Sequence, residues 1–500
     1  MVASLHCDNG GVDAGMAEDF ERALDGSGDR TVVRDAPPQE LNADSGSGQL
    51  MLGDLPAKAR DRQHEPHDSY HESHDVHAPI VSHASDNPVR APYDHHVPSS
   101  THTWLPDRHL GVAATLAHAD ELIGQVGDVL FPYQTQPGGI IRLGEVSDGL
   151  VSRTVVTGVA SIPRKVPLLV ADALVALRNA LEHVLFAEVE YLDGVLDEKA
   201  SRLVEMPAAK TYDDFQKWVK GRARNGPTSL RAGSPLVRRI EALQPLQRTR
   251  DPQDHPLAVL VSHTNHAKHR TPLITAVRLA GMYREDQRPR SAREMPRRPE
   301  TPLKVGEVIA ETPVGTQIPV TLFPTIGINR PGTDRWPVLI AELEQLATWV
   351  RTQAVPRLIT GTDPPTPSLP TRYDITSGHD DERSALSAGS TTSAATNHQQ
   401  RLGAAAVRVD IAETIGQMEG APGPEQIAAW LDSLPDEEML ARMSQIEVTH
   451  TYEPDIVLRN FGLLEKMRDD AIRFGSADPE TERLTWVNAA AAVGDYPSRR

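Results

Sequence analysis

The sequence is short of cysteine and of long apolar runs. It has one cysteine, Cys7, in 500 residues, so an internal disulfide framework is excluded and a reducing, cytoplasmic location is expected. No apolar run approaches the roughly 20 residues that a membrane span needs. The first residues, MVASLHCDNGG, lack the basic and apolar regions of a signal peptide. We therefore expect a cytoplasmic protein without membrane contact, and its preference for Arg over Lys is typical of GC-rich bacterial genes.

Several common functional motifs are also missing. The chain has no GxxxxGK[ST] loop, no GxGxxG after a predicted strand and no HExxH. The usual phosphate-loop, dinucleotide-binding and zinc-protease interpretations therefore have no support in the sequence. We predict neither a cofactor nor a metal site in the folded part of the chain.

Charge is distributed unevenly. The formal net charge is −18, which argues against a chain that coats nucleic acid along its whole length. Between Arg202 and Lys304, however, 21 Lys and Arg stand against 10 Asp and Glu. This basic middle could contact RNA or another phosphate ligand, or it could be a solvated surface that the acidic parts of the chain screen.

Composition divides the chain into five parts. Residues 1–108 are rich in Asp, Gly, Ser, Pro and His and are predicted to form a disordered tail. We expect an α+β core domain at 109–360, followed by a disordered linker rich in Pro, Ser and Thr at 361–401. A small all-α module is predicted at 402–476, and a second tail at 477–500.

The first tail contains closely spaced histidines with carboxylates among them: His64, His67, His71, His74, His77 and His83. Such side chains can hold zinc or nickel loosely. No cysteine is present there to close a structural site, and a disordered backbone would not pre-organise one. We favour a tail without a specific metal site.

The core domain is predicted to be mainly helical with antiparallel strands. Helical periodicity begins near Leu110, and alternation around a Ser-Asp-Gly turn predicts a β-hairpin at about 140–159. The further elements expected are helices at 212–226 and 255–270, short strands within 305–328, and a closing amphipathic helix at about 336–359. Together these elements predict the α+β fold class.

The longest clean helical pattern covers residues 166–187. Its apolar positions, among them Leu177 and Leu181, form a core stripe, whereas small residues such as Ala180 lie roughly opposite. A second face of small residues lets another backbone approach closely. The helix is therefore predicted to be packed on two sides, either centrally or against a second copy in a homodimer. Arg178 can pair with Glu182 one turn along.

Four short sequence segments resemble those of a protein family. ALRNALEHVL, ALQPLQ, HPLAVL and NHAKHR occur in this order. They resemble a bacterial family, with no function known to us, whose members carry a helix of the type LRSALDHL, a Leu-Gln-Pro phrase and an Asn-x-x-Lys-His-Arg ending. The resemblance covers about 110–359, half of the chain, and implies a shared domain rather than an activity.

The hexapeptide Arg178-Asn179-Ala-Leu-Glu-His183 also resembles the motif of the HEPN superfamily of helical ribonucleases. That resemblance implies metal-independent RNA cleavage at a dimer interface. His183 would transfer the proton, Arg178 would hold the phosphate, and Asn179 would orient one of them. The same Arg-to-His spacing recurs at Arg62, Arg90 and Arg250, so spacing alone carries little weight. The competing interpretation makes Arg178 and Glu182 a partly buried pair and His183 a packing residue.

A second cluster, Lys268-His269-Arg270, ends a predicted helix. With His263 and His266 it could hold zinc, but the adjacent positive charges would repel a cation. Recognition of phosphate by Lys268, His269 and Arg270 suits this charge better. Alternatively, these residues only complement the negative end of the helix dipole.

Two functions compete for the whole chain. The first is a non-catalytic binding or scaffold protein in which the polar residues secure helix packing, and the sequence slightly favours it. The alternative is a HEPN-like endoribonuclease of toxin or defence type, active through Arg178 and His183. The C-terminal module has no catalytic constellation and is expected to contact a protein partner.

Overall fold

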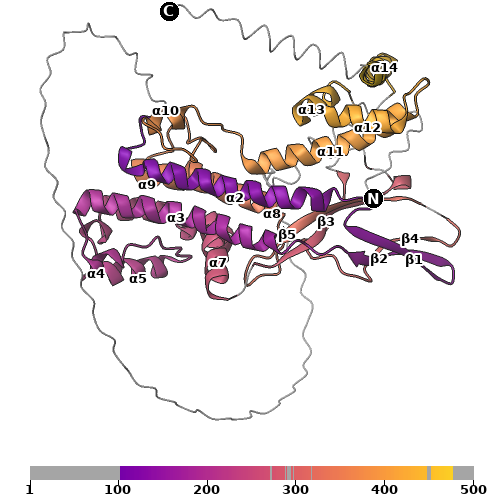
Figure 1. Ribbon diagram of the computed structural model, residues 1–500. Coiled ribbons are helices and arrows are strands. Elements are labelled where there is room, and N and C mark those ends of the chain that lie inside the picture. The colour runs from indigo at the N-terminus through magenta and orange to yellow at the C-terminus, as the bar shows by residue number, and fades with distance from the viewer. Residues whose placement is uncertain are drawn as a thin grey trace, which may run out of the picture. The chain divides into compact units, whose positions relative to one another are not determined.

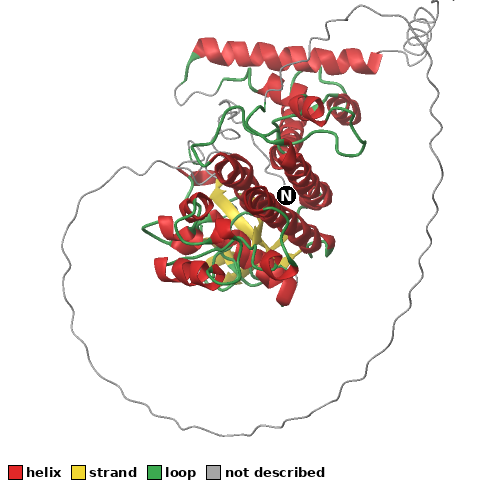
Figure 2. Ribbon diagram, turned by 90° about the vertical axis from the view of Figure 1, so that its left-hand side faces the viewer, coloured by secondary structure: helices red, strands yellow, loops and turns green. Residues whose placement is uncertain are grey.

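The computed structural model describes residues 102–270, 273–287, 289, 294–296, 298–316, 318–447 and 452–476. Residues 1–101 of the first predicted tail, with the six histidines named above, and all of the second tail lie outside these residues. In the described part, helices predominate and the strands form two small antiparallel sheets (Figure 2). The α+β class is therefore confirmed. None of the described helices is long and apolar enough to cross a membrane.

Two long helices form the centre of the core domain, α2 (Leu110–Gln134) and α3 (Lys165–Asp193). They lie side by side (Figure 1). The apolar stripe predicted on α3 is buried, with Leu177 and Leu181 fully inaccessible, and Ala180 on the small-residue face is buried too. The prediction that α3 is packed on two sides is confirmed, and both faces are covered within one chain. A homodimer through this helix stays a prediction.

The predicted hairpin is present as β1 (Ile141–Asp148) and β2 (Val151–Val159). Gly149 closes it with a φ of 63°, a left-handed conformation that glycine adopts without strain. A third strand, β4 (Val308–Pro313), pairs with the other edge of β2, so the strand order is β1-β2-β4.

The second sheet pairs β3 (Thr275–Arg284) with β5 (Val320–Ile328), antiparallel. The strand β3 was not predicted from the sequence. Its residues 277–279 are buried in succession, and a bulge shifts the register between Leu279 and Gly281. Because both features break the period of two, the strand lacks the alternation by which strands are found.

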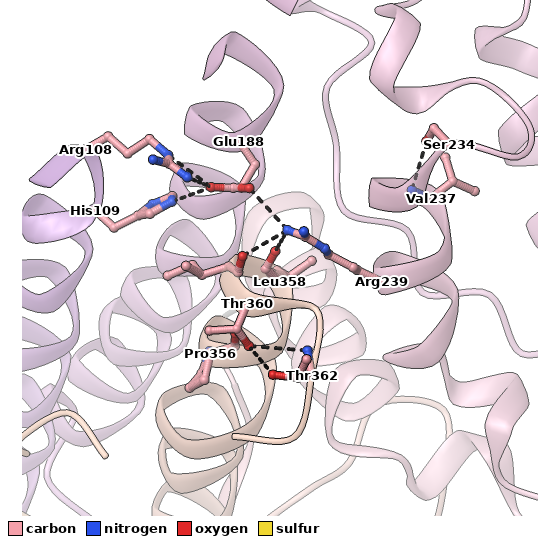
Figure 3. Close-up of polar contacts among 11 residues, drawn as sticks. Arg108, His109, Glu188, Ser234, Val237, Arg239, Pro356, Leu358, Thr360 and Thr362 are labelled. Atoms are coloured by element: carbon pink, nitrogen blue, oxygen red, sulfur yellow. Dashed lines mark hydrogen bonds and ion pairs between the residues drawn. The ribbon is translucent and has the colours of Figure 1, made fainter. Parts of the chain in front are cut away.

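Short helices occupy the side of α3 that faces away from α2 (Figure 1). They include three of the helices between 198 and 269: α4 (Glu198–Ser201), α5 (Tyr212–Arg222) and α7 (Pro256–His269). A further helix, α6 (Pro235–Ala242), precedes α7 and is capped by Ser234, whose hydroxyl accepts the N–H of Val237 (Figure 3). Side-chain caps of this kind fix where a helix starts.

The closing helix of the core domain contains a π-helical turn. It begins as α8 (Leu339–Trp349), continues as a π-helix at Val350–Ala354, and ends as α9 (Val355–Thr360). Pro356 lies just after the π-helix. Because proline has no N–H, one donor is missing there from the hydrogen bonds of the α-helix. Gly361 ends the helix with a φ of 71°.

The expectation of a disordered linker at 361–401 is wrong. This segment contains α10 (Glu382–Ser387), and its residues Leu369, Tyr373 and Leu386 belong to the hydrophobic core. It also holds the residues before α2: Trp104 donates its indole N–H to the carbonyl of Pro367 at 3.1 Å. Single apolar residues in a polar stretch have no period of their own, so only long-range packing orders them.

The predicted all-α module contains four helices among the described residues. They are α11 (Ala394–Gly416), α12 (Pro424–Ser433), α13 (Asp436–Met443) and α14 (Pro454–Ser476). They enclose a second hydrophobic cluster that includes Ile411, Trp430 and Met439. The helix α11 begins eight residues before the predicted boundary at 402, and its first turns pack on α2.

Candidate functional site

Arg178 is buried beside the apolar stripe of α3, with 8% of its surface exposed. Its Nη2 pairs with Glu182 Oε1 at 2.6 Å and donates to the carbonyl of Met206 at 2.6 Å. Glu182 Oε2 accepts the N–H of Met206 at 2.8 Å. Burial raises the pKa of Glu182, and the Arg178 charge opposes this rise. The two side chains therefore clamp the loop that contains Met206 onto α3. The ion pair between them is the one that the packing interpretation predicted.

Asn179 and His183 lie on a different side of α3 and are exposed. The Nδ1 of His183 lies 3.5 Å from the hydroxyl oxygen of Thr115 on α2, too far for a strong hydrogen bond. Arg178 and His183 are five positions apart, which places them about 140° apart around the helix. The structure does not bring the guanidinium and the imidazole together within one chain.

Lys268, His269 and Arg270 form the last turn of α7 and its cap, and all three are exposed. No ion pair or side-chain hydrogen bond joins this basic end of α7 to Arg178 or His183 in the described residues. His263, one of the histidines considered for zinc, is fully buried instead, with its Nε2 3.5 Å from Glu342 Oε1. The described contacts therefore do not join the two predicted clusters, and of the α7 histidines His263 is buried whereas His269 is exposed.

The largest concentration of buried charge around α3 is centred on Glu188, which is 3% exposed (Figure 3). Its Oε1 accepts hydrogen bonds from Arg108 at 2.7 Å and from His109 at 2.7 Å, and its Oε2 lies 3.3 Å from Arg239 Nη1. Arg239 also donates to the carbonyls of Leu358 and Ile359 at the end of α9.

Burial opposes ionisation of Glu188, but the hydrogen bonds from His109 and Arg108 outweigh it and lower the pKa. The carboxylate is therefore charged at neutral pH. It connects the start of α2, the C-terminal part of α3, α6 and the end of α9.

A second buried carboxylate, Glu342 on α8, is also 3% exposed. Arg330 pairs with both of its oxygens, at 2.8 and 2.7 Å, and also bonds Asp254 at 3.0 Å. Burial opposes ionisation of Glu342, but the nearby His263 and the hydrogen bonds from Arg330 lower its pKa. This network fixes α8 against the 3-10 turn before α7. Arg335, which also pairs with Asp254, supplies the second cation for the two carboxylates.

A third buried carboxylate, Asp120 on α2, receives the first N–H of α11. Its oxygens lie 3.0 and 3.2 Å from the nitrogen of Ala394, and Arg372 approaches within 3.2 Å. Burial raises the pKa of Asp120, and the bond from Ala394 together with Arg351 and Arg372 opposes this rise. The contact ties α11 to the core domain.

The sequence interpretation missed all three carboxylates, although a signal existed for two of them. Glu188 continues the stripe of Leu181 and Leu185 at helical spacing, and Glu342 lies between Leu339 and Leu346 on the buried side of α8. An acid at a core position of an amphipathic helix indicates a buried ion pair, because an unpaired buried charge is costly.

A shallow depression of about 460 Å³ lies beside α10. Its lining includes Tyr373, Asp374, His379 and Asp381. Asp374 accepts bonds from Thr376, and Asp381 caps α10, so both carboxylates have partners within the chain. Among the described residues, no group of three or more His, Cys, Asp or Glu side chains is arranged to hold a metal ion. The described residues that line the depression therefore do not form a recognisable catalytic or metal site.

No protein family, curated protein or solved structure matches the chain. The resemblances to the bacterial family and to the HEPN superfamily stay predictions.

Proposed function

We propose that the core domain is a non-catalytic binding scaffold that contacts a phosphate-bearing polymer, with RNA as the probe of choice. The contact surface is the basic side formed by residues 202–270, which includes α5, α6 and α7. The buried charges of the domain serve packing, whereas the exposed cations on this side are available to a partner.

The observation that carries the proposal is an excess of exposed cations without ion-pair partners. Among the described residues of 202–270, the exposed Lys and Arg outside any ion pair are Lys210, Lys220, Arg224, Arg231, Arg238, Arg248, Arg250, Lys268 and Arg270. The exposed acids outside ion pairs in the same stretch are Glu205, Asp213 and Asp251. Such an imbalance favours a polyanion, because each neutralised phosphate releases a counterion.

The arrangement of Arg178 supports a non-catalytic role. Its guanidinium is used to hold Met206 and Glu182, so it is not presented to a phosphate. His183 lies on another side of the helix, and no charged group in the described part of the chain pairs with it. A nuclease needs a proton-transfer group and a cation at one phosphate.

The test is binding of a labelled single-stranded RNA to the full chain at increasing salt concentrations. We expect the affinity to fall as salt rises, and the double substitution Lys268→Ala/Arg270→Ala to reduce the slope by about 1.4, near 0.7 for each phosphate that is no longer neutralised. The matched control is Arg164→Ala/Lys165→Ala, two adjacent exposed cations at the start of α3, which should leave the slope unchanged.

The same reactions distinguish the alternative function. RNA recovered from them should be intact on a denaturing gel with wild type and with His183→Ala alike. Cleavage by wild type that His183→Ala abolishes would establish the nuclease and overturn the non-catalytic proposal. Absence of any RNA binding at a low salt concentration, about 50 mM, would remove the basic side as a polyanion surface.

A further inference from the structure

The last helix, α14, is packed on one side only. Ile456, Met467 and Ala471 are buried against the other helices of the C-terminal module. On the opposite side, Leu458 is 69% exposed and Phe461 is 52% exposed. Figure 2 shows α14 at the edge of the module, with one side turned away from the neighbouring helices. Large apolar side chains grouped on an exposed helix face are typical of an interaction surface.

The exposed side has the spacing of a coiled-coil seam. Leu458, Phe461, Glu465, Arg468 and Ile472 follow one another at intervals of three, four, three and four residues. At about 100° per residue, these positions fall within one side of the helix. The seam has apolar residues towards both ends and one acid and one base in its middle.

We propose that this seam binds the same seam of a second copy of the chain, with the two α14 helices antiparallel. A two-fold axis between positions 466 and 467 places Phe461 against the partner's Ile472 and, symmetrically, Ile472 against the partner's Phe461. The same axis places Glu465 against the partner's Arg468. Four of the five seam residues thus meet a complementary one, as an interface between two identical surfaces requires, and Leu458 lies opposite the partner's Gly475.

Charge selects the antiparallel arrangement. In a parallel pair in register, Glu465 would face the partner's Glu465, and Arg468 would face the partner's Arg468. Within one chain, Arg468 bonds Asp469 at 2.9 Å and the carbonyl of Glu419 at 3.0 Å, while Glu465 lies 4.0 Å away. The side chain of Arg468 is 19% exposed and that of Glu465 is 44% exposed. Glu465 therefore has only a loose partner in its own chain and gains a second cation across the seam.

Dimerisation through α14 is independent of the binding function proposed for the core domain, because the seam lies in the C-terminal module. It also differs from a dimer through α3, whose apolar stripe and small-residue face are both buried within the chain.

The first test measures the mass of the full chain in solution by sedimentation across a range of concentrations. Wild type should form a dimer, and Leu458→Ser/Phe461→Ser should weaken it about 100-fold, since two large apolar side chains of each copy leave the interface. The matched control is Leu150→Ser/Val195→Ser, at positions that are 87% and 97% exposed outside the module. The control should dimerise like wild type. All four substituted residues are exposed, so circular dichroism and thermal midpoints should stay unchanged.

The second test determines the orientation by cross-linking in a Cys7→Ser background, where an introduced thiol is the only one. The two copies of position 466 lie next to the axis, whereas the two copies of position 455, on the same flank of the helix, are about 35 Å apart along it. A short bismaleimide should therefore link Lys466→Cys and not Asp455→Cys.

Three outcomes would overturn the proposal: a monomer at all concentrations, a dimer that persists in Leu458→Ser/Phe461→Ser, and equal cross-linking at both positions. A dimer that persists in this variant would indicate an interface on another face of the chain, such as α3. A monomer that still binds RNA would refute the dimer and leave the function of the core domain standing.

Discussion

Replacing Glu188 by Gln tests whether the buried charge on α3 holds the core domain together. The substitution preserves the shape of the side chain but removes its negative charge, while Arg108, His109 and Arg239 remain around it. It leaves two guanidinium groups without their counter-charge and replaces one acceptor oxygen by an amide that donates.

The expected loss follows from burial. Breaking a buried pair from one side costs about 3 to 5 kcal/mol. Arg108 and Arg239 are 29% and 28% exposed, so water screens part of this loss. We therefore expect the free energy of unfolding to fall by about 3 kcal/mol, which corresponds to a drop of roughly 6 to 12 °C in the melting temperature of a domain of this size.

The assay is urea denaturation followed by circular dichroism, with Glu190→Gln as the matched control. Glu190 lies two residues along the same helix and is exposed, so its substitution should change the free energy of unfolding by no more than about 0.5 kcal/mol. The pKa of Glu188 is lower in the folded state than its ordinary value of 4.5. Its stabilising contribution is therefore complete above pH 4.5 and is lost as the pH falls through the folded pKa. Equal midpoints for the two variants at neutral pH would refute the structural role of this carboxylate.

Two further predictions concern α3 and α11. Arg178→Met should lower the free energy of unfolding by about 2 to 3 kcal/mol, because it leaves the partly buried Glu182 carboxylate, whose side chain is 28% exposed, without its cation. Asn179→Ala should change it by no more than about 0.5 kcal/mol. Similar urea midpoints for the two variants would contradict this. Burial, assisted by Arg401, lowers the pKa of His398 to about 4. As the pH falls, His398 is therefore protonated in the unfolded chain before it is protonated in the folded chain. The stability of the fold is lost as the pH falls from about 6.5 towards 4. Amides of α11 near His398 should exchange faster at about pH 5 than at about pH 7 once intrinsic rates are corrected, and His398→Gln should flatten this dependence; unchanged protection in wild type would count against it.

The elements with a regular period were predictable from the sequence. Apolar residues recur at intervals of two in the hairpin, and at intervals of three to four in the central helix and the helices of the C-terminal module. Each of these elements is present in the structure. The failures share a cause. The strand β3 has consecutive buried residues and a bulge, and the segment 361–401 has isolated apolar residues among Pro, Ser and Thr. Both segments are ordered by contacts with residues that are far away in the sequence, and local sequence patterns do not show such contacts.

The candidate site was predictable only in its packing interpretation. The ion pair between Arg178 and Glu182 follows from a spacing of four residues on a helix, and the structure contains it. The partner that decides the role of Arg178, the carbonyl of Met206, lies 28 residues away and is a backbone atom. A backbone acceptor carries no sequence signal, so the motif alone could not show that the guanidinium was already engaged.

The residues of α2 that α11 contacts are synthesised long before α11 itself. Its first turns contact α2 through residues 264 to 274 positions earlier in the chain, by way of Gln134, Asp128 and Asp120. At roughly 5 to 20 residues per second, a ribosome needs roughly 14 to 55 s to make that interval. During this time the nascent core domain exposes a face of α2 that only α11 will cover. A chaperone that protects this face would act before the C-terminal module emerges.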